Sequence, residues 1–267
     1  MAAAHEHDPF FVPVTADRFE RRLLADLAAG RCAAIRVHDF FSPAECEVVM
    51  RALLDVEFAT YGRARVQPEV MRFGVGVSDY RRDGRISEEF WAAVDEGRRA
   101  WEALNLPFDP FALCRSRLGA DLPQQVEVGR HDGHAMSPGV AREPNQGFLV
   151  HFDDAQREFP GGFLDENVVC QFAFNLYLSV PEEGGETVVW RHRWHPTDDS
   201  HRPDGSYGFK EDVVGAAESF LMRPRKGEAV LLEPRNFHAV RPSKGGRRIS
   251  LGFSVSMTDT GQLLTWG

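Results

Sequence analysis

The chain has 267 residues and a formal net charge of −9, and 43% of its residues are hydrophobic while 27% are charged. A length within one-domain range and this apolar share allow a sizeable core. The acidic balance, without a Lys/Arg block, argues against nucleic acid as the main partner, and no apolar run approaches the ~20 residues that a membrane-spanning helix needs.

The first 120 residues are expected to be mainly helical. Apolar residues within Phe19–Leu27 keep a helical spacing, and Gly30 is a suitable stop. A strand is expected from Cys32. Ser42, with Pro next and Glu45 third after it, is the capping-box start of a second helix. The side chains expected to point inward from that helix are Cys46, Val49, Met50, Leu53 and Leu54.

Three more elements are expected in this part of the chain. The stretch Val70–Tyr80 alternates apolar residues with polar residues and glycine, which predicts a strand. Ser87 is expected to cap a long helix that runs through Trp101. Asp109-Pro110 is expected to open a short helix.

From residue 121 on, short β-type runs follow one another, separated by Gly, Pro and Asp. The runs begin at Gln125, Gly147, Val168, Glu186, Glu218, Glu228, Asn236 and Arg247, with a further candidate at Gln262. We therefore predict an α+β fold in one domain of residues 1–267, with a double-stranded β-helix (jelly roll) core over 121–267 and helical support over 1–120. The polar stretch His192–Lys210 is expected to be a long loop, which is a common form of lid.

The cysteines are widely spaced and include no C-x-x-C pair. A disulfide framework or a thiolate zinc site is therefore not expected. The N-terminus lacks the basic start and the long apolar stretch of a secretory signal. We expect reduced core thiols in a cytoplasmic protein, at Cys32, Cys46, Cys114 and Cys170.

The segment GFLVHFDD ends an apolar run with one imidazole and two carboxylates, at His151, Asp153 and Asp154. Residues i and i+2 of a strand point to the same face, so His151 and Asp153 would share one face and Phe152 and Asp154 the other. A nitrogen donor beside an oxygen donor can grip a divalent metal, although the same pair is also a common surface ion pair.

A third donor, His238, lies in the short predicted strand NFHAV. Two histidines and one carboxylate make a facial triad, which binds Fe(II) and leaves positions open for a bidentate keto-acid and O₂. Downstream, Arg248 and Ser250 alternate onto one face of a strand whose other face is apolar apart from Arg247. A planar guanidinium suits the distal carboxylate of a keto-acid, and Ser250 would add a hydroxyl donor.

This ordered set resembles the Fe(II)/2-oxoglutarate-dependent dioxygenases. More narrowly, LSVPEEGGETVVW from Leu178 and RRISLGFSVSM from Arg247 resemble the carrier-independent aliphatic halogenases of indole-alkaloid biosynthesis, within the broader prolyl-hydroxylase-like group. The resemblance covers roughly residues 140–260 and implies a single catalytic domain that uses Fe(II), 2-oxoglutarate as cosubstrate and O₂. It implies that the iron ligands are His151, Asp153 and His238. It also implies that Arg248 is the 2-oxoglutarate anchor and, more loosely, that Arg142 is a strand arginine near the cosubstrate.

Asp153 departs from the halogenase pattern, in which Gly or Ala leaves an iron position free for chloride. With the carboxylate present, the resemblance implies hydroxylation, desaturation or ring closure instead of chlorination. The implied reaction converts 2-oxoglutarate to succinate and CO₂ and oxidises an unactivated C–H bond of a freestanding small molecule. The expected substrate is a natural-product intermediate, an amino acid or a nucleoside, and the oligomeric state is left open.

Other polar residues have two interpretations each. Asn175 and Tyr177 could face 2-oxoglutarate or could be satisfied polar groups of the core, and Thr187 has the same ambiguity. Asp154 could contact a ligand or occupy a turn. The loop histidines are expected to be solvated and not to form a second metal site, at His131, His134, His192, His195 and His201.

Two rival functions are open at this point. A cupin-type metal enzyme also places His and carboxylate ligands in a jelly roll, but it needs no keto-acid and no Arg-x-Ser pair. A jelly-roll binding protein with a degenerate triad would not be an enzyme. Succinate formation separates the first rival from a dioxygenase, and stoichiometric iron argues against the second.

Overall fold

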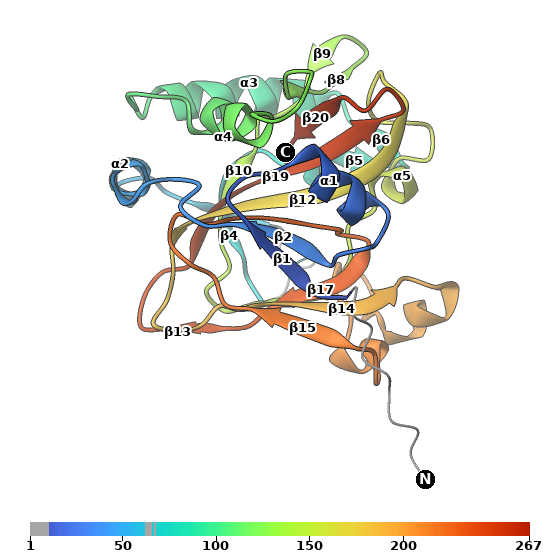
Figure 1. The fold of residues 1–267 in the computed structure, drawn as a ribbon. Coiled ribbons are helices and arrows are strands. Elements are labelled where there is room, and N and C mark those ends of the chain that lie inside the picture. Colours follow the sequence, from blue (N-terminus) through green and yellow to red (C-terminus); the bar gives the residue numbers. More distant parts are fainter. Residues whose placement is uncertain (1–10, 62–65, 67) are drawn as a thin grey trace.

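Two β-sheets, one of ten strands and one of four, face each other in the computed structural model, which describes residues 11–61, 66 and 68–267 (Figure 1). The larger sheet has the order β1 (Pro13–Ala16), β2 (Ala34–Val37), β16 (Ala229–Leu232), β12 (Val168–Ser179), β19 (Ile249–Thr258), β10 (Val140–Glu143), β4 (Met71–Gly74) and β3 (Ala59–Thr60), with β20 (Leu263–Trp266) on β19 and β7 (Glu127–Val128) on β20. The smaller sheet has the order β11 (Phe148–His151), β17 (Asn236–Val240), β14 (Thr187–Arg193) and β15 (Ser219–Met222).

Helices cover the face of the larger sheet that is turned away from the smaller sheet, and in Figure 1 α3 and α4 lie above it while the orange strands of the smaller sheet lie below. The α-helices are α1 (Arg21–Ala28), α2 (Pro43–Leu54), α3 (Glu89–Glu102), α4 (Pro110–Leu118) and the short α5 (Ala155–Glu158). The 3₁₀ helices are η1 (Val77–Tyr80), η2 (Pro196–His201) and η3 (Glu211–Val214). Three two-stranded ribbons complete the described elements, namely β5 (Arg81–Arg82) with β6 (Arg85–Ile86), β8 (Arg130–His131) with β9 (His134–Ala135), and β13 (Glu183–Gly184) with β18 (Ser243–Lys244).

The central strands β12 and β19 divide their side chains between two environments. Because successive strand residues point to opposite faces, one set joins the core beneath the helices and the other faces the smaller sheet. Phe174 and Phe253 stand opposite each other in register on the helix side, where their rings stack with centroids 4.4 Å apart. Asn175 and Ser250 belong to the other set and line a cavity between the sheets. The helices thus stabilise a sheet whose second face is available for polar chemistry.

The predicted start of α2 is confirmed. Ser42 accepts a hydrogen bond from the backbone N–H of Glu45, and the Glu45 carboxylate accepts one from the backbone N–H of Ser42, which completes the capping box. Cys46, Val49 and Leu53 are buried as predicted. Leu54 was expected to point inward and is 60% exposed, because it lies at the end of α2 on the side turned away from the core.

Several expected boundaries were wrong. The strand predicted over Val70–Tyr80 ends at Gly74, which has a φ of +105° and lies so close to the backbone of Gly139 that a side chain there would clash; η1 follows it. The predicted cap Ser87 lies one residue too early, because the N-cap of α3 is Glu88, without a side-chain cap. The strands β1 and β10 and the helix α5 were not predicted.

The cysteine prediction holds, since all four cysteines are free and buried. Burial raises the pKa of the thiols, for example to about 11 for Cys170, so they stay protonated at neutral pH. Within the described ranges, every helix is too short or too polar to cross a membrane.

Glu45 joins α2 to α4 and generates a stability prediction. Its carboxylate accepts hydrogen bonds of 2.6 and 3.0 Å from Arg117, and this contact lowers the pKa of Glu45 to about 2. We expect Glu45→Gln to lower the free energy of unfolding at pH 7 by about 1–2 kcal/mol. The stabilisation is complete above the unfolded-state pKa and is lost as pH falls toward 2, so the difference from wild type should shrink over that window.

Urea unfolding at a series of pH values measures this difference. Glu47→Gln is the control, because Glu47 lies on the same helix with an exposed side chain whose contact with Lys226 is 3.5 Å long. If Glu45→Gln lowers the free energy of unfolding by the same amount at pH 7 and at pH 3, the ionised Glu45 carboxylate is not the source of the stabilisation.

Candidate active site

Three metal-ligating side chains converge where β11 pairs with β17. His151, the last residue of β11, stands directly opposite His238 of β17 in the antiparallel register. One ligand atom from each of His151, Asp153 and His238 can be chosen so that all lie within 4.8 Å of one another. His238 Nε2 is 3.6 Å from Asp153 Oδ2, and the two imidazole centroids are 4.1 Å apart. Among the histidines, cysteines and acidic residues that the structure describes, these three form a group that could hold a metal ion.

Both imidazoles are oriented by backbone carbonyls of their own strands. His151 Nδ1 lies 2.7 Å from the carbonyl oxygen of Leu149, and His238 Nδ1 lies 3.0 Å from that of Asn236. A carbonyl can only accept, so Nδ1 of each ring carries a proton, and Nε2 is the atom that can present a lone pair to a metal ion. Burial, followed by the proximity of His238, lowers the pKa of His151 to about 3. His151 is therefore a neutral nitrogen donor at physiological pH.

Asp153 is held by contacts that the sequence pattern did not predict. The sequence argument placed His151 and Asp153 on one face of a strand, but strand β11 ends at His151. The two side chains do lie together, and the position of Asp153 has another cause. Beyond the strand, the N–H of Asp153 donates to the carbonyl of Pro234 over 2.9 Å. Tyr207 donates its hydroxyl proton to Asp153 Oδ1. Burial by itself would raise the pKa of Asp153, but the two histidines and Tyr207 together hold it below its usual value, so the carboxylate is ionised.

Arg248 is buried against the wall of the same cavity, with 3% of its surface exposed. Its Nε donates to the carbonyl of Gly185 over 2.9 Å, and Nη2 donates to Thr187 Oγ1 over 3.2 Å. The guanidinium carbon lies 5.0 Å from the ring centroid of Tyr177. Burial lowers the pKa of Arg248. These contacts fix the guanidinium plane, and within the described residues none of them is with a carboxylate.

Arg247 points out of the cavity, as the face argument predicted. Its guanidinium pairs with Glu143 over 2.6 Å. Ser250 and Asn175 do line the cavity, together with the metal triad and Arg248. All the predicted site residues therefore line one cavity, and of the two neighbouring arginines Arg248 faces the cavity and Arg247 does not.

Arg142 of β10 also lines the cavity, and it stands opposite Ser250 in register. Its Nε donates to the hydroxyl of Tyr61 over 3.0 Å. Burial by itself lowers the pKa of Arg142, but Tyr61 and Asp153 raise it above its ordinary value, so the guanidinium is charged. Arg142 and Arg248 are thus two separate cations on the wall of one cavity.

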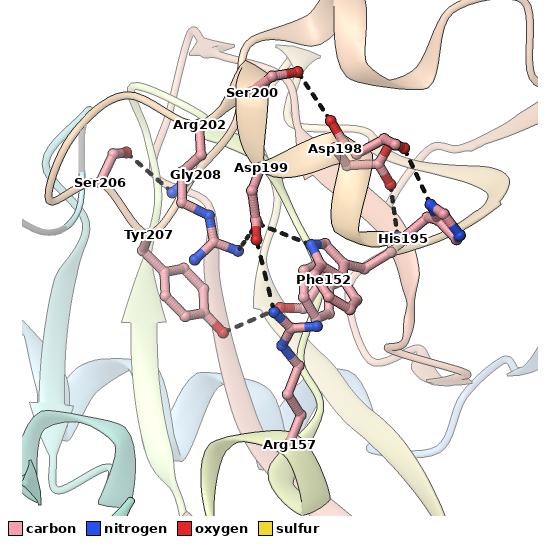
Figure 2. A network of polar contacts seen from close by, with 12 residues as sticks. Phe152, Arg157, His195, Asp198, Asp199, Ser200, Arg202, Ser206, Tyr207 and Gly208 are labelled. Carbon is pink, nitrogen blue, oxygen red and sulfur yellow. Dashed lines mark hydrogen bonds and ion pairs between the residues drawn. The ribbon is translucent and has the colours of Figure 1, made fainter. Parts of the chain in front are cut away.

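The stretch expected to be a long loop is packed and internally bonded. Figure 2 shows Arg157 and Arg202 converging on Asp199, at 3.9 and 3.7 Å, and Tyr207 directed at the backbone of Phe152. Asp199 also accepts from Trp194 Nε1 over 2.9 Å. Phe209, Val213 and Val214 pack against the outer face of the smaller sheet. This network fixes Tyr207 beside the triad.

Sequence reasoning missed Tyr207, because nothing in a polar loop marks one tyrosine as the neighbour of a distant carboxylate. Asp154 was expected either to occupy a turn or to contact a ligand; it caps α5 by accepting from the N–H of Arg157 over 3.2 Å, and it also lines the cavity. The loop histidines were expected to be solvated; His134 and His195 are exposed, whereas His131 and His192 are half-buried against other side chains. His192 pairs with Asp198 over 3.0 Å, and His131 lies parallel to Trp91.

The donor set suits Fe(II). Two imidazoles and one carboxylate could supply three ligands to one metal ion and leave its remaining positions to other ligands. The carbonyl contacts at both Nδ1 atoms are the outer contacts that metal-binding histidines usually make.

Comparisons with known proteins point to the same chemistry. Residues 130–267 match the family described as the carrier-protein-independent halogenase WelO5. The L-gamma-glutamyl-L-propargylglycine hydroxylase of Streptantibioticus cattleyicolor is 34% identical over 269 residues, which span 100% of both chains. The Leucinostatins biosynthesis cluster protein S of Purpureocillium lilacinum is 32% identical over 142 residues, or 52% of this chain and 57% of that protein.

Among solved structures, an N-substituted L-amino acid dioxygenase from Burkholderia ambifaria, in complex with alpha-KG, has a similar fold. Its TM-score is 0.58 at 16% sequence identity, over 92% of this chain and 90% of that chain. The family match, the full-length hydroxylase relative and the converging H-x-D triad agree with one another. The chain belongs to the Fe(II)/2-oxoglutarate-dependent oxygenases, within the WelO5-like family, and it carries the hydroxylase form of the triad.

Proposed function

We propose that His151, Asp153 and His238 hold Fe(II), and that Arg248 anchors 2-oxoglutarate in the cavity beside it. The enzyme is a 2-oxoglutarate-dependent dioxygenase that hydroxylates a small molecule and releases succinate and CO₂. The convergence of the triad with a buried guanidinium in one cavity is the observation that supports these residue roles. When bound, the iron with 2-oxoglutarate and O₂ supplies the oxidising power for an unactivated C–H bond.

Each protein residue has a defined task in this proposal. The backbone carbonyls aim the two Nε2 lone pairs at one point, and Asp153 neutralises one of the metal's positive charges. Asp153 also fills the position that a halogenase leaves to chloride, which favours hydroxylation over chlorination.

The distal carboxylate of 2-oxoglutarate would meet Arg248, which presents a fixed plane of donors. Ser250, two residues away on β19, would add a hydroxyl donor, and Asn175 would contact the cosubstrate from β12. A cupin-type enzyme or a binding protein has no need for a buried arginine without a carboxylate partner, so the site favours the dioxygenase over both alternatives.

We further propose that the two facing sheets form a double-stranded β-helix within a single catalytic domain. The order β11-β17-β14-β15 of the smaller sheet and its position opposite β12 and β19 support this description. For the substrate, the full-length relative is the guide, because it is named for L-gamma-glutamyl-L-propargylglycine. We infer that this enzyme takes a freestanding amino-acid-derived molecule of similar size.

Anaerobic titration of the metal-free protein with Fe(II) and 2-oxoglutarate tests the proposed site. We expect one equivalent of iron to bind, a weak visible charge-transfer band to appear on addition of 2-oxoglutarate, and each ligand to tighten the binding of the other. Asp153→Gly should bind Fe(II) at least ~10-fold more weakly, because it loses one of three ligands. A protein without the band and without this mutual tightening would contradict the assigned roles.

Arg248→Ala is expected to weaken 2-oxoglutarate binding selectively. The loss of a buried bidentate partner costs about 2–5 kcal/mol, which corresponds to a ~30-fold or larger rise in the dissociation constant. The iron affinity measured without 2-oxoglutarate should stay within about twofold, because Arg248 does not contact the triad. Arg247→Ala is the matched control on the neighbouring position outside the cavity. Equal effects of the two variants on 2-oxoglutarate binding would move the anchor away from Arg248.

Tyr207→Phe tests whether the loop positions the metal ligand. Without the hydroxyl, Asp153 loses the hydrogen bond that orients its Oδ1. We expect Fe(II) affinity to fall ~10-fold, with an unchanged dissociation constant for 2-oxoglutarate in the iron-loaded protein. Ser200→Ala changes an exposed hydroxyl of the same loop and serves as the control. If both variants hold iron as tightly as wild type, Tyr207 only packs.

A further inference from the structure

Two guanidinium groups share the cavity, but the proposed cosubstrate has one distal carboxylate. Arg248 lies against Thr187 and Gly185, and Arg142 lies on the other side of Ser250, beside Tyr61. The iron and Arg248 together carry three positive charges, which Asp153 and doubly charged 2-oxoglutarate balance. This charge count does not use Arg142, and the other carboxylates that line the cavity, Asp154 and Glu158, are bound elsewhere, at the N–H of Arg157 and at Ser78.

The neighbours of Arg142 leave much of its guanidinium available to a ligand. Its Nε donates a hydrogen bond to the Tyr61 hydroxyl, and no carboxylate of the described residues lies within ion-pair distance of the guanidinium. Glu158, another charged group on the cavity wall, accepts a hydrogen bond from Ser78 over 3.2 Å, and one of its oxygens lies 3.5 Å from the Tyr207 hydroxyl. An unpaired cation that faces a cavity is costly unless a ligand neutralises it.

Gly252 leaves space on the sheet for the Arg142 side chain. It lies within β19, where a glycine weakens a strand and usually marks the close approach of another group. A Cβ at this position would lie 3.1 Å from Arg142 Nη1 and 3.4 Å from Asn175 Oδ1. The missing side chain thus leaves room for the Arg142 guanidinium over Gly252.

We infer that Arg142 binds a carboxylate of the substrate, so that the enzyme selects amino-acid-derived molecules with a free carboxylate. This inference rests on the proposed function, because it assigns the 2-oxoglutarate tail to Arg248. Arg142 is attached through Tyr61 to the N-terminal part of the cavity wall, which Val66 and Val70 continue with apolar surface. The substrate would place its charged end on Arg142 and its apolar part toward these valines.

Matched acid and amide ligands test this selectivity without turnover. The probes are L-γ-glutamyl-L-norvaline and N-acetyl-L-norvaline, each as the free acid and with the norvaline carboxylate converted to a primary amide. Calorimetry is done anaerobically with Fe(II) and 2-oxoglutarate present. We expect at least one acid to bind wild type ~10-fold or more tightly than its amide, because only the acid makes the charge-assisted pair.

Variants of Arg142 assign the selectivity to this residue. Arg142→Gln should bind acid and amide equally weakly and should keep the 2-oxoglutarate dissociation constant within about twofold of wild type. Arg142→Lys keeps the charge without the fork and should recover part of the preference. Arg98→Gln, on the exposed side of α3, is the control, and thermal melting checks that each variant is folded.

Three outcomes would overturn the inference: no binding of either acid to wild type, equal binding of acid and amide, or a loss of 2-oxoglutarate binding in Arg142→Gln as large as in Arg248→Ala. The last outcome would make Arg142 a cosubstrate residue. Failure of the proposed function is distinguishable, because wild type would then not bind 2-oxoglutarate with Fe(II) at all.

Discussion

The pairing of β11 with β17 is the constraint on which the site depends. It places His151 opposite His238, and each strand supplies the carbonyl that orients its own imidazole. A slip of one residue in this register would turn one histidine to the outer face, which packs against Phe209. The apolar outer face of the smaller sheet therefore protects the metal geometry as well as the fold, because it makes every other register costly.

The cavity holds charged groups of both signs that do not pair directly with one another in the described residues. Arg142 and Arg248 both face it without a carboxylate within ion-pair distance in the described part of the chain, and the Asp153 carboxylate lies beside the two imidazoles. Such an arrangement lowers the stability of the empty protein and strengthens its binding of anions and a metal cation. Ligand binding and folding stability are thus linked, and the iron and cosubstrate should raise the thermal stability of the enzyme.

Much of the fold and the central chemistry could be predicted from the sequence. The capping box at Ser42 is local chemistry between residues three apart, and the strand period of β12 and β19 reports which face is buried. The same period separated Arg248 from Arg247. The triad was accessible because its residues sit in or directly after apolar strands, where polar side chains are conspicuous. These features depend on patterns between residues close in the sequence, or on polar residue types that rarely occur in an apolar strand without a function.

What could not be predicted depends on contacts between distant segments. Asp153 is oriented by Pro234 and Tyr207, and a polar loop contains no local signal that one of its side chains will reach a carboxylate more than fifty positions earlier. Gly252 interrupts an otherwise regular strand pattern, and its purpose becomes visible only when β10 is placed beside β19 and Arg142 is found above it. The residues that we propose for the general chemistry are thus accessible from sequence, whereas the contacts of Asp153 with Tyr207 and of Arg142 with Gly252 depend on tertiary structure.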